Sequence, residues 1–231
     1  MSDGHDRTPR FHVEVRLAPG AALSLPPSAA HHASRVLRMR EGDAVMLFNG
    51  MGGEYAARLV RISRDGVSVQ AGAFDPVERE SPLAVTLVQG ISSGDRMDLT
   101  IQKAVELGVA AIQPILADRS LVKLKGERGD SRREHWQRIA GAACEQCGRN
   151  RVPPVAAALS ASDYRAPGGA LKLMMAPSGS ASLRTAGIQA GSQVVLAGGP
   201  GAGCSPRQEA VLAGPGLGWF AVGPTRPPRG T

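Results

Sequence analysis

A glycine-rich segment in the last quarter of the chain is the first candidate for chemistry. Residues 198–205 read Gly-Gly-Pro-Gly-Ala-Gly-Cys-Ser and follow an apolar run. Glycine lets the backbone approach a ligand closely, and its N–H groups can bind anions or polar edges. A phosphate-binding P-loop has a lysine before its serine, but Cys204 stands there, which argues against a nucleotide triphosphatase. A simple tight turn is the alternative.

A polar segment after an expected helix is the second candidate. Gly148 is placed to end the helix, and Arg149, Asn150 and Arg151 follow it. Arginine pairs with phosphate in a planar, bidentate geometry, so this set suits the backbone of a nucleic acid. In the alternative, the two arginines only cover the carbonyl groups at the helix C-terminus.

Other reactive residue types give weaker indications. Cys144 and Cys147 form a C-x-x-C pair on the apolar face of the expected helix, without a second Cys/His pair at ligand spacing. We therefore expect small core residues there and no metal. His31 and His32 indicate neither catalysis nor metal binding. Hydrolase and metalloprotease motifs are absent from the sequence.

The charge of the chain favours a polyanionic partner. There are 27 basic and 20 acidic residues, a net charge of +7. Eight basic residues follow residue 146, against only Asp163 and Glu209. Nucleic acid is favoured over membrane because no basic amphipathic segment accompanies this charge. A solvated basic surface is the alternative.

Composition limits the class of protein. A hydrophobic content of 42% excludes wholesale disorder, and three cysteines do not make a disulfide framework in 231 residues. No apolar run approaches the roughly 18 residues of a membrane span. The first ten residues lack an apolar signal core, so we expect a cytoplasmic protein.

The first third of the chain predicts β structure. In residues 11–17, Val13, Val15 and Leu17 alternate with polar residues, which is typical of a half-buried strand. Three further short strands are expected, with turns at Asn49-Gly50 and Asp65-Gly66, and a short helix or turn precedes them in residues 28–43. We predict a small β-barrel with one helix in residues 1–72, followed by a linker in residues 73–82.

From residue 83 to residue 231 the pattern alternates between strands and helices. Residues 83–90 form an apolar run typical of a strand buried on both faces, and a helix ending at Gly108 follows. Residues 132–147 have apolar residues at helical spacing. Further strands are expected at residues 111–116, 171–176, 192–198 and 219–223, with a helix between the second and third of these and another starting at Ser205. This α/β pattern predicts a mostly parallel sheet with ligand loops at the strand C-termini.

Three segments resemble one family in their order and spacing. They are residues 96–108 (RMDLTIQKAVELG), 136–139 (WQRI) and 145–153 (EQCGRNRVP). They resemble the ribosomal RNA small subunit methyltransferase E family. Arg10-Phe11 and residues 31–43 (HHASRVLRMREGD) are similar to the PUA-like RNA-binding barrel of that family. The resemblance extends from about residue 10 to about residue 224.

The resemblance implies a function and a fold. Family members methylate N3 of a uridine in 16S rRNA of the small ribosomal subunit with S-adenosylmethionine and need no metal. Their second domain is a SPOUT-type α/β domain with a C-terminal trefoil knot, and they form homodimers. The cofactor residues implied here are Met175, Ala176, Pro177, Leu196, Ala197, Gly198, Gly199, Pro200, Gly201, Gly203, Val222, Gly223 and Pro224. The RNA contacts expected are Arg10, Arg35, Arg38, Arg149, Asn150 and Arg151. No catalytic residue is assigned.

The C-terminal part departs from the family pattern. Gly201, Ala202 and Cys204 replace a glutamate, a glycine and an apolar residue of the family loop. Residues 225–231 (TRPPRGT) stand where the family continues into a further helix, so a truncated end and an incomplete knot are expected. Two alternatives follow. One is a degenerate homologue that binds rRNA but little methyl donor, and the other is a metabolite-binding α/β protein.

Overall fold

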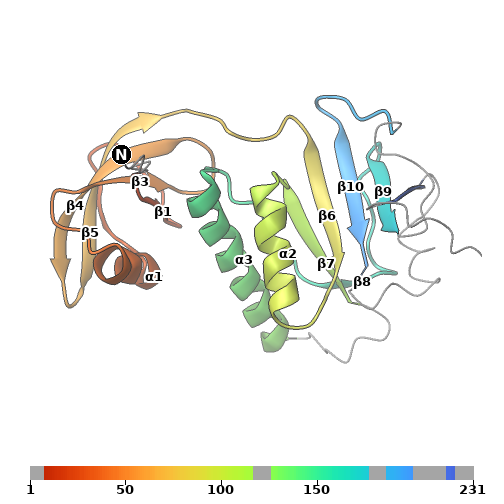
Figure 1. Ribbon diagram of the computed structural model, residues 1–231, viewed down its shortest axis with the longest axis horizontal. Helices are drawn as coiled ribbons and strands as arrows, with labels where there is room; N and C mark the ends of the chain where they lie inside the picture. Colours follow the sequence, from red (N-terminus) through yellow and green to blue (C-terminus); the bar gives the residue numbers. More distant parts are fainter. Residues whose placement is uncertain (1–7, 117–125, 177–185, 200–216, 222–231) are drawn as a thin grey trace, which may run out of the picture. The chain divides into compact units, whose positions relative to one another are not determined.

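The computed structural model describes residues 8–116, 126–176, 186–199 and 217–221 (Figure 1). The described residues fall into two compact units that interleave along the chain. The first contains the residues up to Glu80 together with Gly141–Val152, and the second contains Ser81–Ala140 and the residues from Pro153 onward. The division into domains at residues 1–72 and 83–231 stays a prediction. None of the described helices has the length and apolar character that crossing a bilayer needs.

The first unit contains a five-stranded sheet. The strands β1 (Arg10–His12) and β3 (Ala44–Phe48) pair in parallel. The sheet continues through antiparallel pairs to β4 (Glu54–Ser63), β5 (Gly66–Asp75) and β2 (Ala22–Ser24), so that β1 and β2 are its outer strands. The expected short strands and hairpin are confirmed. Closure of this sheet into a barrel stays a prediction.

A short helical segment covers the core of the first unit. It consists of α1 (Pro27–His31) and a π-helical turn, η1 (His32–Val36), within the segment where the sequence predicts a helix or turn. Ala33 is fully buried and belongs to the same apolar cluster as Phe11 and Leu47. This packing fixes the segment against the sheet.

The first predicted strand is shorter than its sequence pattern suggests. Val13 and Leu17 are buried, as the alternation predicts, but Val15 is 51% exposed. The chain leaves the sheet after His12, and the N–H of Val13 donates the last bond to the carbonyl of Phe48 (3.0 Å). Without a neighbouring strand beyond that point, nothing holds the alternation in register.

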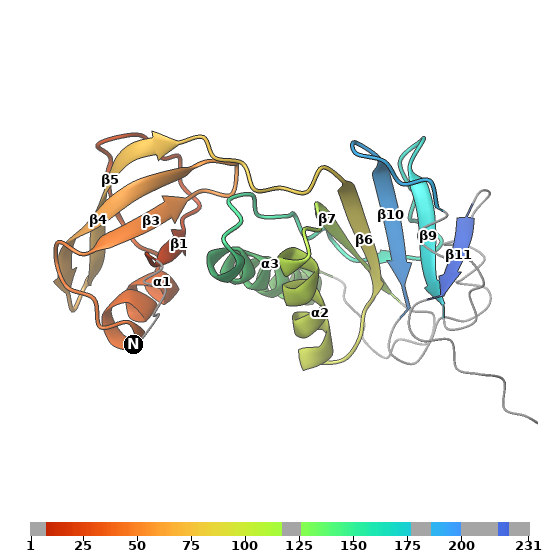
Figure 2. The ribbon, with the colours of Figure 1, turned by 45° about the horizontal axis from the view of Figure 1, so that its top comes forward.

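The second unit contains a six-stranded sheet in which every pair is parallel. Its strand order is β11-β9-β10-β6-β7-β8, and Figure 2 shows β11, β9, β10 and β6 side by side. The strand bounds are β6 Ala84–Gly90, β7 Ala111–Leu116, β8 Leu159–Ser160, β9 Leu171–Ala176, β10 Gln193–Gly198 and β11 Leu217–Ala221. The predicted parallel α/β sheet is confirmed.

Two helices lie beside β6 and β7 in both ribbon views (Figures 1 and 2). Helix α2 (Asp95–Glu106) buries Met97, Ile101 and Val105, and it ends just before Gly108, whose φ of +90° suits glycine. Helix α3 (Glu127–Cys147) buries Trp136 and Ala140. The segments expected to form the knot and the helix after Ser205 lie outside the described residues, as does most of the segment expected to be helical before β10.

A buried carboxylate holds the first unit together at one end of β4. The Glu54 side chain is only 4% exposed and accepts hydrogen bonds from Arg10 (2.5 Å) and Arg79 (2.6 and 2.9 Å). Burial alone would raise the pKa of this carboxyl, but the hydrogen bonds from the two arginines outweigh burial and leave the pKa below its ordinary value. Glu54 is therefore charged at neutral pH.

We expect Glu54→Gln to lower the free energy of unfolding by about 2–3 kcal/mol at neutral pH, because the substitution leaves Arg10 buried without its counter-charge. This is less than the loss for a fully buried pair, because the Arg79 side chain is 38% exposed and water screens it. Urea denaturation measures the difference. Glu14→Gln, an exposed glutamate of the same unit, is the matched control.

The lowered pKa of Glu54 also predicts that the stability of the wild-type protein and that of Glu54→Gln depend differently on pH. A carboxyl whose folded-state pKa is lowered contributes stability above its unfolded-state pKa, and this contribution is lost as the pH falls through the lowered value. Below its ordinary value of 4.5, wild-type stability should fall more steeply than that of Glu54→Gln. Parallel acid profiles of the two proteins would contradict a paired role for Glu54.

Candidate functional site

The carboxyl ends of four neighbouring parallel strands form the candidate site of the second unit. In the register of the sheet, Gly198 of β10 lies opposite Gln89 of β6, and Ala221 of β11 lies opposite Ala176 of β9. In open parallel sheets, ligands bind outside this edge. The three expected cofactor loops follow β9, β10 and β11. The described ends of these strands lie at one edge of the sheet.

The expected cofactor residues divide into two sets. Met175 and Ala176 end β9, and Leu196, Ala197, Gly198 and Gly199 end β10 or follow it directly. These two groups lie on adjacent strands. The remaining predicted residues, Pro177, Pro200, Gly201, Gly203, Val222, Gly223 and Pro224, lie outside the described part of the chain.

Gln89 is a site residue that the sequence analysis did not single out. Its side chain is buried, and Nε2 donates hydrogen bonds to the carbonyl oxygens of Gly90 (2.9 Å) and Gly199 (3.0 Å). These bonds hold the start of the glycine-rich segment against the end of β6. The amide side chain at the end of the largely apolar run LAVTLVQG was the available indication.

Two of the described strand ends have no charged side chain. These are residues 89–91 at the end of β6 and residues 196–199 at the end of β10. To a ligand at this edge, these described residues can therefore offer backbone N–H and C=O groups and apolar contact. Among the residues that the structure describes, no group of three or more His, Cys, Asp or Glu side chains could hold a metal ion.

Tyr164 packs under this edge against a cluster that includes Met174 and Ala197. Burial raises the pKa of its phenol, so the hydroxyl is protonated at neutral pH. The Tyr164 Oη atom is buried and has no hydrogen-bond partner among the described residues. It is therefore a buried, neutral donor in the cluster that contains Met174 of β9 and Ala197 of β10.

The predicted RNA-contact segment is fixed within the first unit. Arg149 is 6% exposed and is paired with Glu80, with an Nε–Oε1 distance of 3.0 Å. Asn150 is fully buried and donates from Nδ2 to the carbonyl of Val77 (2.6 Å). Their side chains thus hold residues 77–80 against residues 149–150, and little of either is accessible to a ligand.

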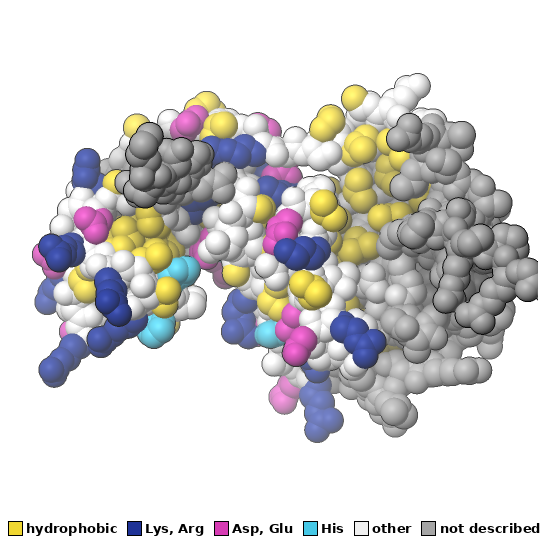
Figure 3. All heavy atoms as spheres, viewed as in Figure 1, with side chains coloured by type: hydrophobic (Ala, Val, Ile, Leu, Met, Phe, Trp, Pro, Cys, Tyr) yellow, Lys and Arg dark blue, Asp and Glu magenta, His cyan; other side chains and the backbone are white. Residues whose placement is uncertain are grey.

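The other predicted RNA contacts differ in exposure. The Arg10 side chain is 14% exposed and is paired with Glu54, whereas Arg151 is 52% exposed and pairs with Glu78 (2.6 Å). Arg35 and Arg38 are exposed at η1 and just after it. Figure 3 shows Lys/Arg and hydrophobic side chains next to each other over this part of the first unit.

The cysteine pair is not a reactive site. Cys144 is fully buried, and burial raises the pKa of its thiol to about 12, so it stays protonated. Its Sγ donates a weak hydrogen bond to the carbonyl of Arg151 (3.5 Å). The prediction of a core residue is confirmed for Cys144, and Cys147 is half-buried.

Arg149 and Arg151 make a matched pair for a stability test. We expect Arg149→Ala to lower the free energy of unfolding by about 3 kcal/mol, because it leaves Glu80 without its partner in a largely buried pair. Arg151→Ala should cost less than about 1 kcal/mol, because its ion pair is exposed to water. Chemical denaturation measures both, and equal losses would contradict a structural role for Arg149.

Two family models match the sequence. A model described as the RNA methyltransferase domain matches residues 79–226, and one described as the RNA methyltransferase PUA domain matches residues 25–71. Two relatives that are similar in sequence are also RNA methyltransferases by name. Ribosomal RNA small subunit methyltransferase E of Bacillus subtilis is 35% identical over 149 residues, which are 63% of this chain and 58% of that protein. The Mycobacterium bovis protein of the same name is 28% identical over 222 residues, which are 93% and 84% of the two chains.

The chain spans less than two thirds of the Bacillus subtilis relative, but it aligns more completely with solved structures. A ribosomal RNA small subunit methyltransferase E from Neisseria gonorrhoeae, bound to S-adenosyl methionine, is 37% identical with a TM-score of 0.85. The alignment covers 94% of this chain and 90% of that one. A Legionella pneumophila methyltransferase in complex with the cofactor SAM is 36% identical with a TM-score of 0.87 and the same coverage. On these matches in sequence and fold, this chain belongs to the ribosomal RNA small subunit methyltransferase E family.

Proposed function

We propose that this protein transfers a methyl group from S-adenosylmethionine to N3 of a uridine in 16S rRNA of the small ribosomal subunit. The observation that carries the proposal is the match to the Neisseria gonorrhoeae enzyme, which was solved with S-adenosyl methionine bound. The alignment covers at least 90% of this chain and of that enzyme. The basic charge of +7 supports an RNA substrate. Such a substrate places the reaction in the cytoplasm.

The described strand ends fit the methyl donor. Gln89 holds the carbonyl of Gly199, and the glycines at the end of β10 allow a ligand to approach the backbone closely. No charged side chain between Leu196 and Gly199 competes for the polar groups of the cofactor. When bound, S-adenosylmethionine supplies an electrophilic methyl group on a positively charged sulfur.

The protein's own task is to position the nucleotide and exclude water. Uridine N3 lies on the Watson–Crick edge, so the base must be unpaired to be reached. In-line placement of N3 and the methyl group supplies much of the acceleration. N3 loses its proton in the reaction, and an arginine near the uracil would stabilise the developing negative charge on N3 and O4. Arg226 and Arg229, which follow the expected cofactor residue Pro224 in the sequence, lie outside the described residues.

The RNA contacts that we propose follow from exposure. Arg35, Arg38 and Arg151 would contact the phosphate backbone directly, since their side chains are exposed. Arg10, Arg149 and Asn150 would act by holding the surface in shape, because each has a hydrogen-bond partner inside the first unit. The trefoil knot, the homodimer and the remaining cofactor residues are part of the same proposal.

Calorimetric titration of the full chain with S-adenosylmethionine tests the donor site. We expect saturable binding and transfer of tritium from the methyl-labelled donor to 16S rRNA in small subunits from a strain that lacks the modification. A stop in primer extension identifies the modified uridine, because a base methylated at N3 cannot form a Watson–Crick pair. Binding of rRNA without binding of the donor would favour the degenerate homologue, and donor binding without RNA affinity would favour a metabolite-binding protein.

Gln89 offers a second test, with Gln113 on the neighbouring strand β7 as its matched control. The Nε2 of Gln113 also donates two hydrogen bonds to backbone carbonyls, those of Pro114 (3.0 Å) and Ala157 (2.8 Å). Gln89→Ala should weaken donor binding about tenfold, because the carbonyl of Gly199 loses its partner. Gln113→Ala should leave donor affinity unchanged. Equal affinities in the three proteins would contradict the role of Gln89.

A further inference from the structure

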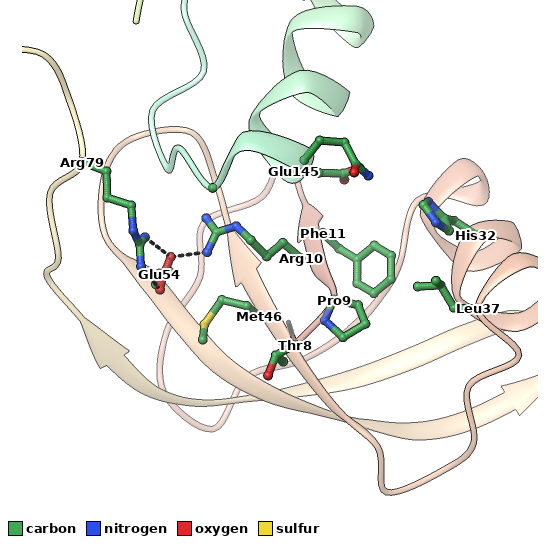
Figure 4. Close-up of a pocket in the computed structure, with 12 residues that line it drawn as sticks. Thr8, Pro9, Arg10, Phe11, His32, Leu37, Met46, Glu54, Arg79 and Glu145 are labelled. Carbon is green, nitrogen blue, oxygen red and sulfur yellow. Dashed lines mark hydrogen bonds and ion pairs between the residues drawn. The ribbon is translucent and has the colours of Figure 1, made fainter. Parts of the chain in front are cut away.

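A cavity in the first unit is not used by the proposed methyl-donor site. It has a volume of about 440 Å³ and is lined by residues of β1, the η1 turn and the last turn of α3. Figure 4 shows Phe11 and Pro9 between Arg10 on one side and His32 and Leu37 on the other, with Glu145 above them. A cavity of this size is large enough for a small planar ligand.

One wall of the cavity is apolar and partly exposed. The His32 ring packs edge-on against Phe11, with a centroid distance of 6.2 Å and an interplanar angle of 81°. Leu37 at the rim is 42% exposed, and its neighbour Val36 is 61% exposed. The apolar side of the cavity is therefore open to solvent at Leu37.

The opposite wall offers hydrogen-bond donors and acceptors. Arg10 donates through Nη1 to Glu54 and through Nη2 to the carbonyl of Arg149, but its buried Nε has no partner among the described residues. Glu145 accepts the N–H of His12 at Oε1 (2.8 Å), and burial raises the pKa of its carboxyl. Gln146 adds an exposed amide to the lining, with both a donor and an acceptor.

The backbone of the turn at the rim is strained. Arg38 has a φ of +53° and is the only residue other than glycine with positive φ in the described part of the chain. The turn is closed by bonds from the N–H of Leu37 to the carbonyl of His32 and from the N–H of Met39 to the carbonyl of Ala33, both 2.9 Å. Glycine would suit this conformation better. Strain of this kind is found where a side chain has a function.

We propose that this cavity binds one unstacked nucleobase of single-stranded RNA, with Arg38, which follows the lining residue Leu37, on an adjoining phosphate. An apolar wall facing hydrogen-bonding groups is how proteins hold splayed-out bases. The inference rests on the proposed function, which makes RNA the partner. It adds a nucleotide-binding site in the first unit to the methyl-donor site of the second.

Fluorescence anisotropy with labelled oligoribonucleotides tests the cavity. The probes are short single-stranded oligomers of uridine and of adenosine, and an abasic oligomer with the same sugar–phosphate backbone. Leu37→Ala and Gln146→Ala should weaken binding of a base-bearing oligomer about tenfold and leave binding of the abasic oligomer unchanged. Val60→Ala, which truncates a 52% exposed side chain on β4, is the matched control and should bind like wild type.

Arg38→Gly separates function from stability. It should weaken binding of base-bearing and abasic oligomers alike, because it removes a phosphate contact, and at the same time raise the melting temperature by relieving the positive φ. A structural role for Arg38 would lower the melting temperature instead, which would overturn this assignment. Melting curves of all the variants confirm that they fold.

The outcomes distinguish this inference from the proposed function. Wild-type affinity of Leu37→Ala and Gln146→Ala for base-bearing oligomers would overturn the nucleobase pocket, as would an equal loss for abasic and base-bearing oligomers. In both cases donor binding and methylation of 16S rRNA by the wild-type protein would stand. Absence of any affinity of the wild-type chain for 16S rRNA would overturn the RNA methyltransferase proposal together with the pocket.

Discussion

The ion pairs between two distant segments of the chain are the constraint on which the first unit depends. One segment, residues 77–80, follows β5, and the other, residues 149–151, follows α3. Glu80 pairs with Arg149, and Glu78 pairs with Arg151. Burial of Arg149 would be costly without this partner, because an uncompensated guanidinium loses its hydration. Each segment therefore stabilises the other. Both segments belong to the first unit, although they lie about 70 positions apart in the sequence.

The second unit is organised by its parallel sheet. Parallel pairing places the ends of β6, β9, β10 and β11 at one edge, so residues more than a hundred positions apart meet there. Backbone groups beyond the last ladder bond lack partners in the sheet, and Gln89 satisfies one of them at Gly199. A glutamine side chain can do this without adding charge. The described ends of β6 and β10 thus stay neutral while Gly199 is held in place.

Periodicity predicted most of the elements, because burial on one or both faces is a local property of a segment. The run LAVTLVQG indicated a central strand, and the helical spacing around Trp136 indicated α3. The pairing of charges could not be predicted in this way. Arg149 and Glu80 are 69 positions apart, and only the fold shows that the arginine has an acidic partner. The predicted burial of Val15 was wrong for a related reason, because its exposure depends on where the strand pairing ends, and the sequence of one segment does not show this.

The arginine excess consequently has two physical meanings in this chain. Arg10, Arg79, Arg149 and Arg151 are each paired with a glutamate in the first unit, so their charge is largely neutralised within the fold. No ion pair joins Arg35 or Arg38 to another described residue, and both lie in or next to the exposed turn that follows α1. A long-range field attracts RNA only through charge that is not compensated nearby. In the proposed RNA contact, the uncompensated Arg35 and Arg38 and the exposed Arg151 attract the phosphates, while the buried pairs of Arg10 and Arg149 hold the first unit in shape.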